Sequence, residues 1–235
     1  MPLIQILMPL IIMGFVFVSI GNVGYWNDSN YALFLIIGYQ VTLVHGIISS
    51  IPSSFKTEKE WRTISGLIIA PLHRFVVLFG MLLSKLLLIS APFVILLVIG
   101  VIIYPISFLT FGAILVTYFF ISLVFMGLGT ILGVFAISKE SLWKLSDSGL
   151  SFLFMLSGLI YPIEIFPGIF QFFIKLNPMY YFFDLLRLTW IENDIFLSIS
   201  THWFHVSVLL LCSVIIPLIA IYMFDKIYAR FGIEG

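Results

Sequence analysis

Charged residues are what this sequence has least of. Lysine and arginine number 11 of the 235 residues, aspartate and glutamate another 11, and charged residues are 9% of the chain. A soluble domain typically carries about 25%. Here 62% of the residues are hydrophobic and the mean hydropathy is +1.21. No soluble fold of this size hides so much apolar surface, so lipid must be the solvent for much of the chain.

Other absences exclude whole classes of site. The one cysteine, Cys212, cannot form a disulfide within the chain. The net charge is zero and the few basic residues form no patch, so we expect no nucleic-acid partner. No nucleotide-binding G-x-x-x-x-G-K-[ST], no H-E-x-x-H and no Ser–His–Asp arrangement is present within the spans. His202 and His205 have no acidic residue at metal-motif spacing, so we expect no metal.

Long apolar runs are abundant, and six of them are long enough to cross a bilayer. They lie near residues 2–21, 31–51, 76–104, 108–137, 145–161 and 203–224. Lipid offers no partner for backbone polar groups and no β-barrel alternation is visible, so each span is expected to be helical. The fifth is the weakest, because its most apolar part is short and ends at Pro162. The first lacks the basic region of a signal peptide. The sequence therefore predicts one all-α transmembrane domain over residues 1–235.

Basic residues set the expected orientation. If the loop at 52–74 is cytoplasmic, nine basic residues lie on that side and two, Lys175 and Arg187, on the other. The nine are Lys56, Lys59, Arg62, Arg74, Lys85, Lys139, Lys144, Lys226 and Arg230. This bias follows the positive-inside rule. With six spans it predicts a multi-pass protein of the plasma membrane with both termini in the cytoplasm.

The loop "KTEKEWRTISGLIIAPLHR", residues 56–74, concentrates six of the rare charges. Thr57 followed by Glu60 has the T-x-x-E form of a capping box, and Pro71 ends the pattern, so we expect a helix over 57–69. Trp61, Ile64 and Ile68 would share one face of it. Two interpretations remain open: a solvated connector, or a docking element for a cytosolic partner.

The run "EKEWRTISGLIIAPLHRFVVLFG" resembles the cytoplasmic loop of ABC transporter permeases of the type-2 export class. The matching residues are Glu60, Arg62, Thr63, Ile64, Pro71, Arg74 and Gly80. Ser65 and Met81 depart from the family pattern, which often has Glu and Lys there. The resemblance implies a coupling helix between spans 2 and 3. Its expected contacts with an ATPase subunit are Glu58, Lys59, Glu60, Trp61, Arg62 and Thr63.

A second stretch, "LSGLIYPIEIFPGIFQFFIKLNPMYYFFDLLR", is similar to the same family near its last span. The residues that carry this resemblance are Ser157, Gly158, Pro162, Pro167, Asn177, Pro178, Tyr181, Asp184 and Arg187. From the residues themselves we expect two short helices, 167–176 and 178–191, each opened by proline, with Asn177 as an N-cap. Asp184 and Arg187 are spaced to pair. An interfacial aromatic platform and a re-entrant external gate both remain open, and the resemblance favours the gate.

The stretch "GLGTILG" at 127–133 is not a nucleotide loop, since it lies within a span and lacks lysine. Gly129 and Gly133 instead form a small-xxx-small face that favours close helix packing.

The resemblance implies the membrane subunit of an ATP-driven exporter. It implies an ABC ATPase on a separate chain that binds ATP and Mg²⁺, with no cofactor on this chain. It also implies a homodimer or a pair with a second permease in the lipid bilayer.

Many phenylalanines suit a hydrophobic substrate, a lipophilic drug-like compound or a lipid. A lipid-linked polysaccharide is the alternative cargo. A self-powered carrier or a lipid enzyme is disfavoured, because the spans hold few ionisable groups.

Overall fold

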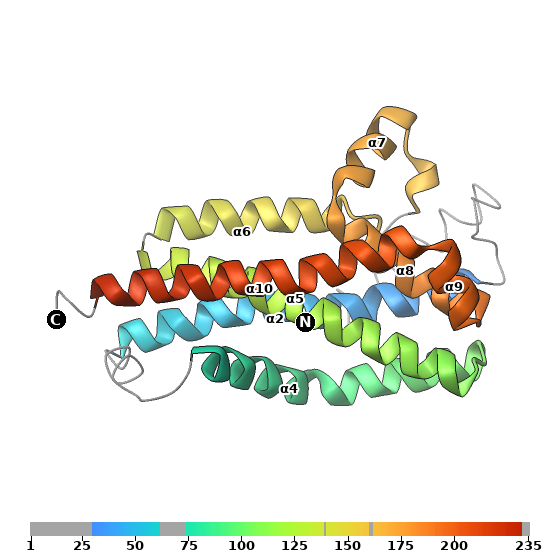
Figure 1. The fold of residues 1–235 in the computed structure, drawn as a ribbon, viewed down its shortest axis with the longest axis horizontal. Helices are drawn as coiled ribbons and strands as arrows, with labels where there is room; N and C mark the ends of the chain where they lie inside the picture. Colours follow the sequence, from blue (N-terminus) through green and yellow to red (C-terminus); the bar gives the residue numbers. More distant parts are fainter. Residues whose placement is uncertain (1–29, 62–73, 139, 160–161, 232–235) are drawn as a thin grey trace.

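The structure is a computed structural model and describes residues 30–61, 74–138, 140–159 and 162–231 (Figure 1). Every regular element within these ranges is a helix. They are α2 (Tyr31–Glu60), α4 (Arg74–Ile103), α5 (Phe108–Ser138), α6 (Glu140–Met155), the 3₁₀ turn η1 (Ile163–Ile165), α7 (Gly168–Leu176), α8 (Pro178–Glu192), α9 (Ile195–Thr201) and α10 (Trp203–Phe231). The expected all-α class is confirmed for the described part of the chain.

Four of the described helices are long and apolar enough to cross a membrane: α2, α4, α5 and α10. They coincide with the second, third, fourth and sixth predicted spans. Each has 29 to 31 residues, or roughly 45 Å at 1.5 Å per residue, which exceeds the ~30 Å hydrocarbon layer. The first predicted span, 2–21, lies outside the described residues.

The fifth predicted span, 145–161, has the wrong bounds. The helix found there, α6, begins at Glu140, ends at Met155 and has 16 residues, about 24 Å. Beyond it the chain turns, and Gly158 takes a left-handed backbone angle, φ 71°. Glycine adopts this region freely, whereas a continuing helix cannot. The count of six spans therefore stays a prediction.

Helix α5 lies at the centre of the bundle and packs most extensively against α2 and α10 (Figure 1). In its most apolar window 67% of residues are buried, against 11% in α4. Inside the core, the Tyr118 hydroxyl donates to Gln40 Oε1 at 2.7 Å and links α5 to α2. Most of the apolar surface of α4 is not covered by other described helices. We therefore expect it to face lipid.

The helix predicted over 57–69 does not begin at Thr57. Helix α2 runs without a break to Glu60, and Trp61 is its C-cap. The Thr57 hydroxyl donates back to the Ser53 carbonyl at 3.0 Å, as a threonine inside a helix does. The capping-box interpretation is wrong, because the backbone N–H groups it would serve are already bonded within α2. Residues 62–69 lie outside the described residues.

Helices α7 and α8 lie where the sequence predicted them, with bounds within one residue. Asn177 caps α8 by accepting from the Met179 N–H at 3.1 Å, and Pro178 takes the first helical position. Pro167 stands one place earlier than expected, at the N-cap of α7. The pair and α9 lie at the end of the bundle opposite the last turn of α2 (Figure 1).

Candidate gate and coupling sites

Asn177 joins the start of α8 to the end of α6. Besides capping α8, its side-chain amide donates to the Leu153 carbonyl at 2.6 Å. That carbonyl lies in the last turn of α6, where backbone oxygens have no partner within the helix. Asn177 itself is 5% exposed, and its two bonds hold α6 and α8 in one geometry.

Arg187, on α8, binds the turn that follows α6. Its Nη1 donates to the Gly158 carbonyl and its Nη2 to the Leu159 carbonyl, each at 2.8 Å. The guanidinium carbon also lies 3.7 Å from the centre of the Phe34 ring on α2, a close cation–π contact. Burial lowers the pKa of Arg187 to about 10, which leaves the group charged at neutral pH. One cation therefore fastens α8 to the α6–η1 turn and to α2.

The turn fits against α2 at a glycine. A Cβ atom added to Gly38 would lie 3.3 Å from the Leu159 carbonyl oxygen, which leaves little room for a larger residue. Ser157, fully buried, donates its hydroxyl to the Phe154 carbonyl in the last turn of α6 and so fixes the start of the turn. The predicted set Ser157, Gly158, Asn177 and Arg187 is thus brought together in one buried cluster.

The predicted ion pair between Asp184 and Arg187 does not form. Asp184 Oδ2 instead lies 3.2 Å from His205 Nε2, and the Tyr180 hydroxyl donates to it at 3.4 Å. Their i, i+3 spacing would allow the pair, but each side chain is engaged by a partner on another element. Arg187 faces the α6–η1 turn, whereas Asp184 faces α10.

A second histidine–carboxylate pair was not anticipated. His202 Nε2 lies 2.9 Å from Glu192 Oε1, and the Ser198 hydroxyl donates to Glu192 Oε2 at 2.5 Å. Together with His205–Asp184 it ties α8 to α9 and α10. The sequence carries no signal for this pair, because ten positions and a whole helix separate its members. In the described ranges no three His, Cys, Asp or Glu side chains meet in a group that could hold a metal ion.

The remaining predicted gate residues shape the connections around α7. Pro162 is the N-cap of η1 and Pro167 that of α7. The Tyr181 hydroxyl, on α8, donates to the Lys175 carbonyl at 2.6 Å and so covers the last turn of α7. Five large apolar side chains of α7 stay exposed: Ile169, Phe170, Phe172, Phe173 and Leu176. This short helix therefore presents an apolar face that suits lipid better than water.

Four of the six predicted coupling residues, 58–61, are described and lie at the opposite end of the bundle, in the last turn of α2 and its C-cap. Trp61 is 73% exposed, and Glu60 makes a loose surface pair with Lys56 at 3.9 Å. Lys59 is also exposed, but its Nζ donates to the Ile137 carbonyl at 2.6 Å, in the last turn of α5. Glu58 lines a polar hollow shared with Lys85 of α4. Arg62 and Thr63 lie outside the described residues.

Gly129 and Gly133 lie where α5 meets α2. A Cβ at Gly129 would be 3.0 Å from the Ile48 carbonyl oxygen, and one at Gly133 would be 2.2 Å from Phe55 Cδ2. Gly127 makes a similar approach to α10, where an added Cβ would be 2.9 Å from the Pro217 nitrogen. The third glycine was not singled out from the sequence, since it does not share their four-residue spacing.

Comparison with known proteins adds one match. A family model described as ABC-2 type transporter covers residues 1–190, which include α2, the described helices from α4 to α7 and most of α8. A comparison with curated proteins gives no match.

Proposed function

This chain belongs to the ABC-2 type transporter family. We propose that it is the permease subunit of an exporter driven by a separate ATPase chain. Its four apolar helices and its family make it a membrane permease. The proposal adds the energy source, the partner and the cargo. It assigns outward movement of a lipophilic drug-like compound or lipid to a dimer of this chain, or to a pair with a similar permease.

The observation that carries the proposal is the contrast between the two ends of the bundle. At one end the last turn of α2 exposes Trp61 and Glu60 beside the charged run to Arg74. At the other end α8 is held by the buried cation of Arg187 and by two histidine–carboxylate pairs. An exposed mixed-charge turn suits docking of a cytosolic protein. A short helix held by several buried contacts suits a gate that stays closed until a conformational change of the spans breaks those contacts.

In the proposed cycle, ATP and Mg²⁺ bind the partner ATPases and bring them together. The segment 58–63 receives this motion and passes it to α2, which packs along α5. The spans then change from inward-open to outward-open. Helices α7 and α8 move apart from the spans on the outer side and open the exit for the cargo. Hydrolysis resets the cycle. The 235 residues hold no G-x-x-x-x-G-K-[ST] sequence, which supports placing the nucleotide on another chain.

Co-purification tests the partner. The tagged chain is extracted from native membranes in mild detergent, and the proteins that follow it are identified by mass spectrometry. We expect an ATPase that carries a nucleotide loop, and we expect it to be lost from a Glu60→Lys/Arg62→Glu variant. An Asp225→Lys/Lys226→Glu variant is the matched control, because it also reverses two neighbouring charges. These residues lie near the C-terminal end of α10, and that end of α10 lies at the same end of the bundle as the last turn of α2 (Figure 1). Wild-type protein that brings down no such ATPase, while other membrane complexes survive, refutes the proposal.

Transport tests the cargo. Proteoliposomes that hold the complete complex are loaded with ATP and a fluorescent lipophilic dye, and efflux is followed over time. We expect ATP-dependent efflux that the Glu60→Lys/Arg62→Glu variant loses. An ATPase-bound complex that moves no dye contradicts the lipophilic cargo and leaves the lipid-linked polysaccharide as the substrate to assay.

A further inference from the structure

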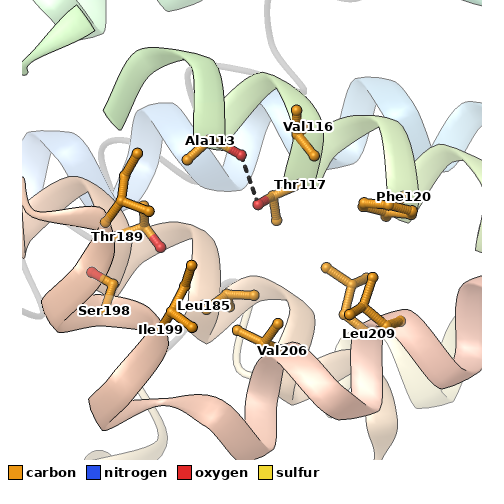
Figure 2. Close-up of a pocket in the computed structure, with 12 residues that line it drawn as sticks. Ala113, Val116, Thr117, Phe120, Leu185, Thr189, Ser198, Ile199, Val206 and Leu209 are labelled. Atoms are coloured by element: carbon orange, nitrogen blue, oxygen red, sulfur yellow. Dashed lines mark hydrogen bonds between the residues drawn. The ribbon is translucent and has the colours of Figure 1, made fainter. Parts of the chain in front are cut away.

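A cavity of about 150 Å³ lies between two spans and the two helices that close their end (Figure 2). Helix α5 contributes one wall and α10 the facing wall, while α8 and α9 cover the end. Figure 2 shows Val116, Thr117 and Phe120 of α5 across the gap from Val206 and Leu209 of α10. The gate cluster around Arg187 does not contribute to the lining.

The mouth of this cavity opens onto lipid. The exposed lining residues are Val116, Ile199 and Leu210, at 54%, 50% and 43% exposure, and all three are apolar. Two of them belong to α5 and α10, which are long and apolar enough to span a membrane. Val116 lies about 12 Å along α5 at 1.5 Å per residue, within reach of the hydrocarbon layer. The cavity is therefore continuous with the lipid-facing surface.

Two of the three hydroxyl groups in the lining are hydrogen-bonded to the protein. The Thr117 hydroxyl donates to the Ala113 carbonyl at 2.9 Å, the bond drawn in Figure 2. The Ser198 hydroxyl donates to Glu192. The third hydroxyl residue is Thr189, and the other nine lining side chains are apolar. A ligand here would meet mainly methyl, methylene and ring carbons, so an apolar group suits it best.

We propose that this cavity binds the end of one acyl chain of a bilayer phospholipid. An apolar cavity of about this volume stays dry and accepts a benzene-sized apolar group, so a short terminal stretch of a fatty-acyl chain fits. Acyl chains are the solvent at the mouth and need no passage through water to enter. The site does not depend on the proposed transport cycle, and it places a lipid tail against α8 and α9.

Photolabelling tests the site. The purified protein is placed in nanodiscs that contain a phosphatidylcholine with a diazirine near the end of one acyl chain, irradiated, digested and sequenced by mass spectrometry. We expect adducts concentrated on residues 113–120 and 195–210. A Val206→Phe substitution fills the cavity from α10 and should reduce those adducts about fivefold or more, since overpacking excludes a guest.

A Val214→Phe variant is the matched control. It makes the same change two turns along α10, at a residue 57% exposed that does not line the cavity. Its adducts should match those of the wild type. If Val206→Phe lowers the thermal midpoint, Thr117→Leu fills the cavity from α5 instead and should give the same loss. Labelling spread evenly along α4 and α10, or labelling that neither filling variant reduces, overturns the proposal. Labelling that an added lipophilic dye displaces at micromolar concentration also overturns it, because the cavity would then be a cargo site.

Discussion

Arg187 Nη1 donates to the carbonyl of Gly158 at 2.8 Å, across 29 positions of sequence. The donor belongs to α8 and the acceptor to the turn where α6 ends. A buried cation that bonds neutral carbonyls gains the strength of a charge-assisted bond without a carboxylate partner. This contact, and not an ion pair along α8, joins α8 to the turn after α6.

Replacing Arg187 by methionine should cost about 2–4 kcal/mol, because two buried carbonyl oxygens lose their donors together with a cation–π contact. Thermal or denaturant unfolding in detergent micelles measures the change. Arg187→Lys keeps the charge but loses the two-pronged geometry, so an intermediate cost is expected. Asp184→Asn should cost less than either. An Asp184→Asn variant as unstable as Arg187→Met would mean that the contact of Asp184 with His205 holds α8 as strongly as the guanidinium does.

Gly158→Ala should destabilise the protein by about 1–2 kcal/mol, since its φ of 71° is unfavourable for a residue with a Cβ atom. Gly149→Ala provides the control within α6. An added Cβ there meets nothing within 4 Å, and alanine favours a helix interior by about 0.5–1 kcal/mol. The two substitutions should therefore move the unfolding midpoint in opposite directions. Equal shifts would mean that the turn after α6 is not held in this conformation.

Gly129→Ala should cost about 1–3 kcal/mol, because the new methyl group would press on the α2 backbone at Ile48 and Ile47, which cannot yield as a side chain does. Gly112→Ala, also on α5, has open space around it and should be neutral or stabilising. Unfolding of the purified variants distinguishes them. Equal stability of the two would refute close packing of α5 on α2.

Lys59→Met should lower stability by about 1 kcal/mol through loss of its bond to the Ile137 carbonyl at the end of α5. Lys56→Met is the matched control three positions earlier. Its pair with Glu60 is long and exposed, so its loss should cost no more than about 0.5 kcal/mol. Unfolding measures the difference. If Lys59→Met spares stability yet weakens co-purification of the ATPase, Lys59 serves the partner and not α5.

Glu164→Gln should alter the pH dependence of stability. Partial burial, with help from the charge of Asp184, raises the pKa of Glu164 above its ordinary 4.5. The folded state therefore disfavours the carboxylate relative to the unfolded chain. Stability from this group is present below pH 4.5 and is lost as the pH rises through the raised pKa. We expect the variant to have the higher unfolding midpoint at pH 7 and no advantage at pH 4. A variant with the lower midpoint at pH 7 contradicts this sign.

The sequence predicted α7 and α8 well, because their signals are local. Proline at 167 and 178 opens each helix, and Asn177 satisfies the first N–H groups of the second. Local signals also misled. Thr57 with Glu60 has the form of a capping box, but both residues lie inside the last turns of α2. The backbone N–H groups there are already bonded within the helix, so no N-cap is needed.

By itself the sequence determined that lipid is the solvent, that four described helices are spans, and which family motifs the chain carries. These follow from hydrophobic run length, from the scarcity of charge and from order along the chain. The tertiary structure alone decided which groups meet. Arg187 reached the Gly158 and Leu159 carbonyls, Asp184 reached His205, and Lys59 reached the end of α5. A buried polar group forms a hydrogen bond with a partner that helix packing brings within about 3 Å. That partner often lies on a distant helix, so the spacing of residues within one helix does not specify it.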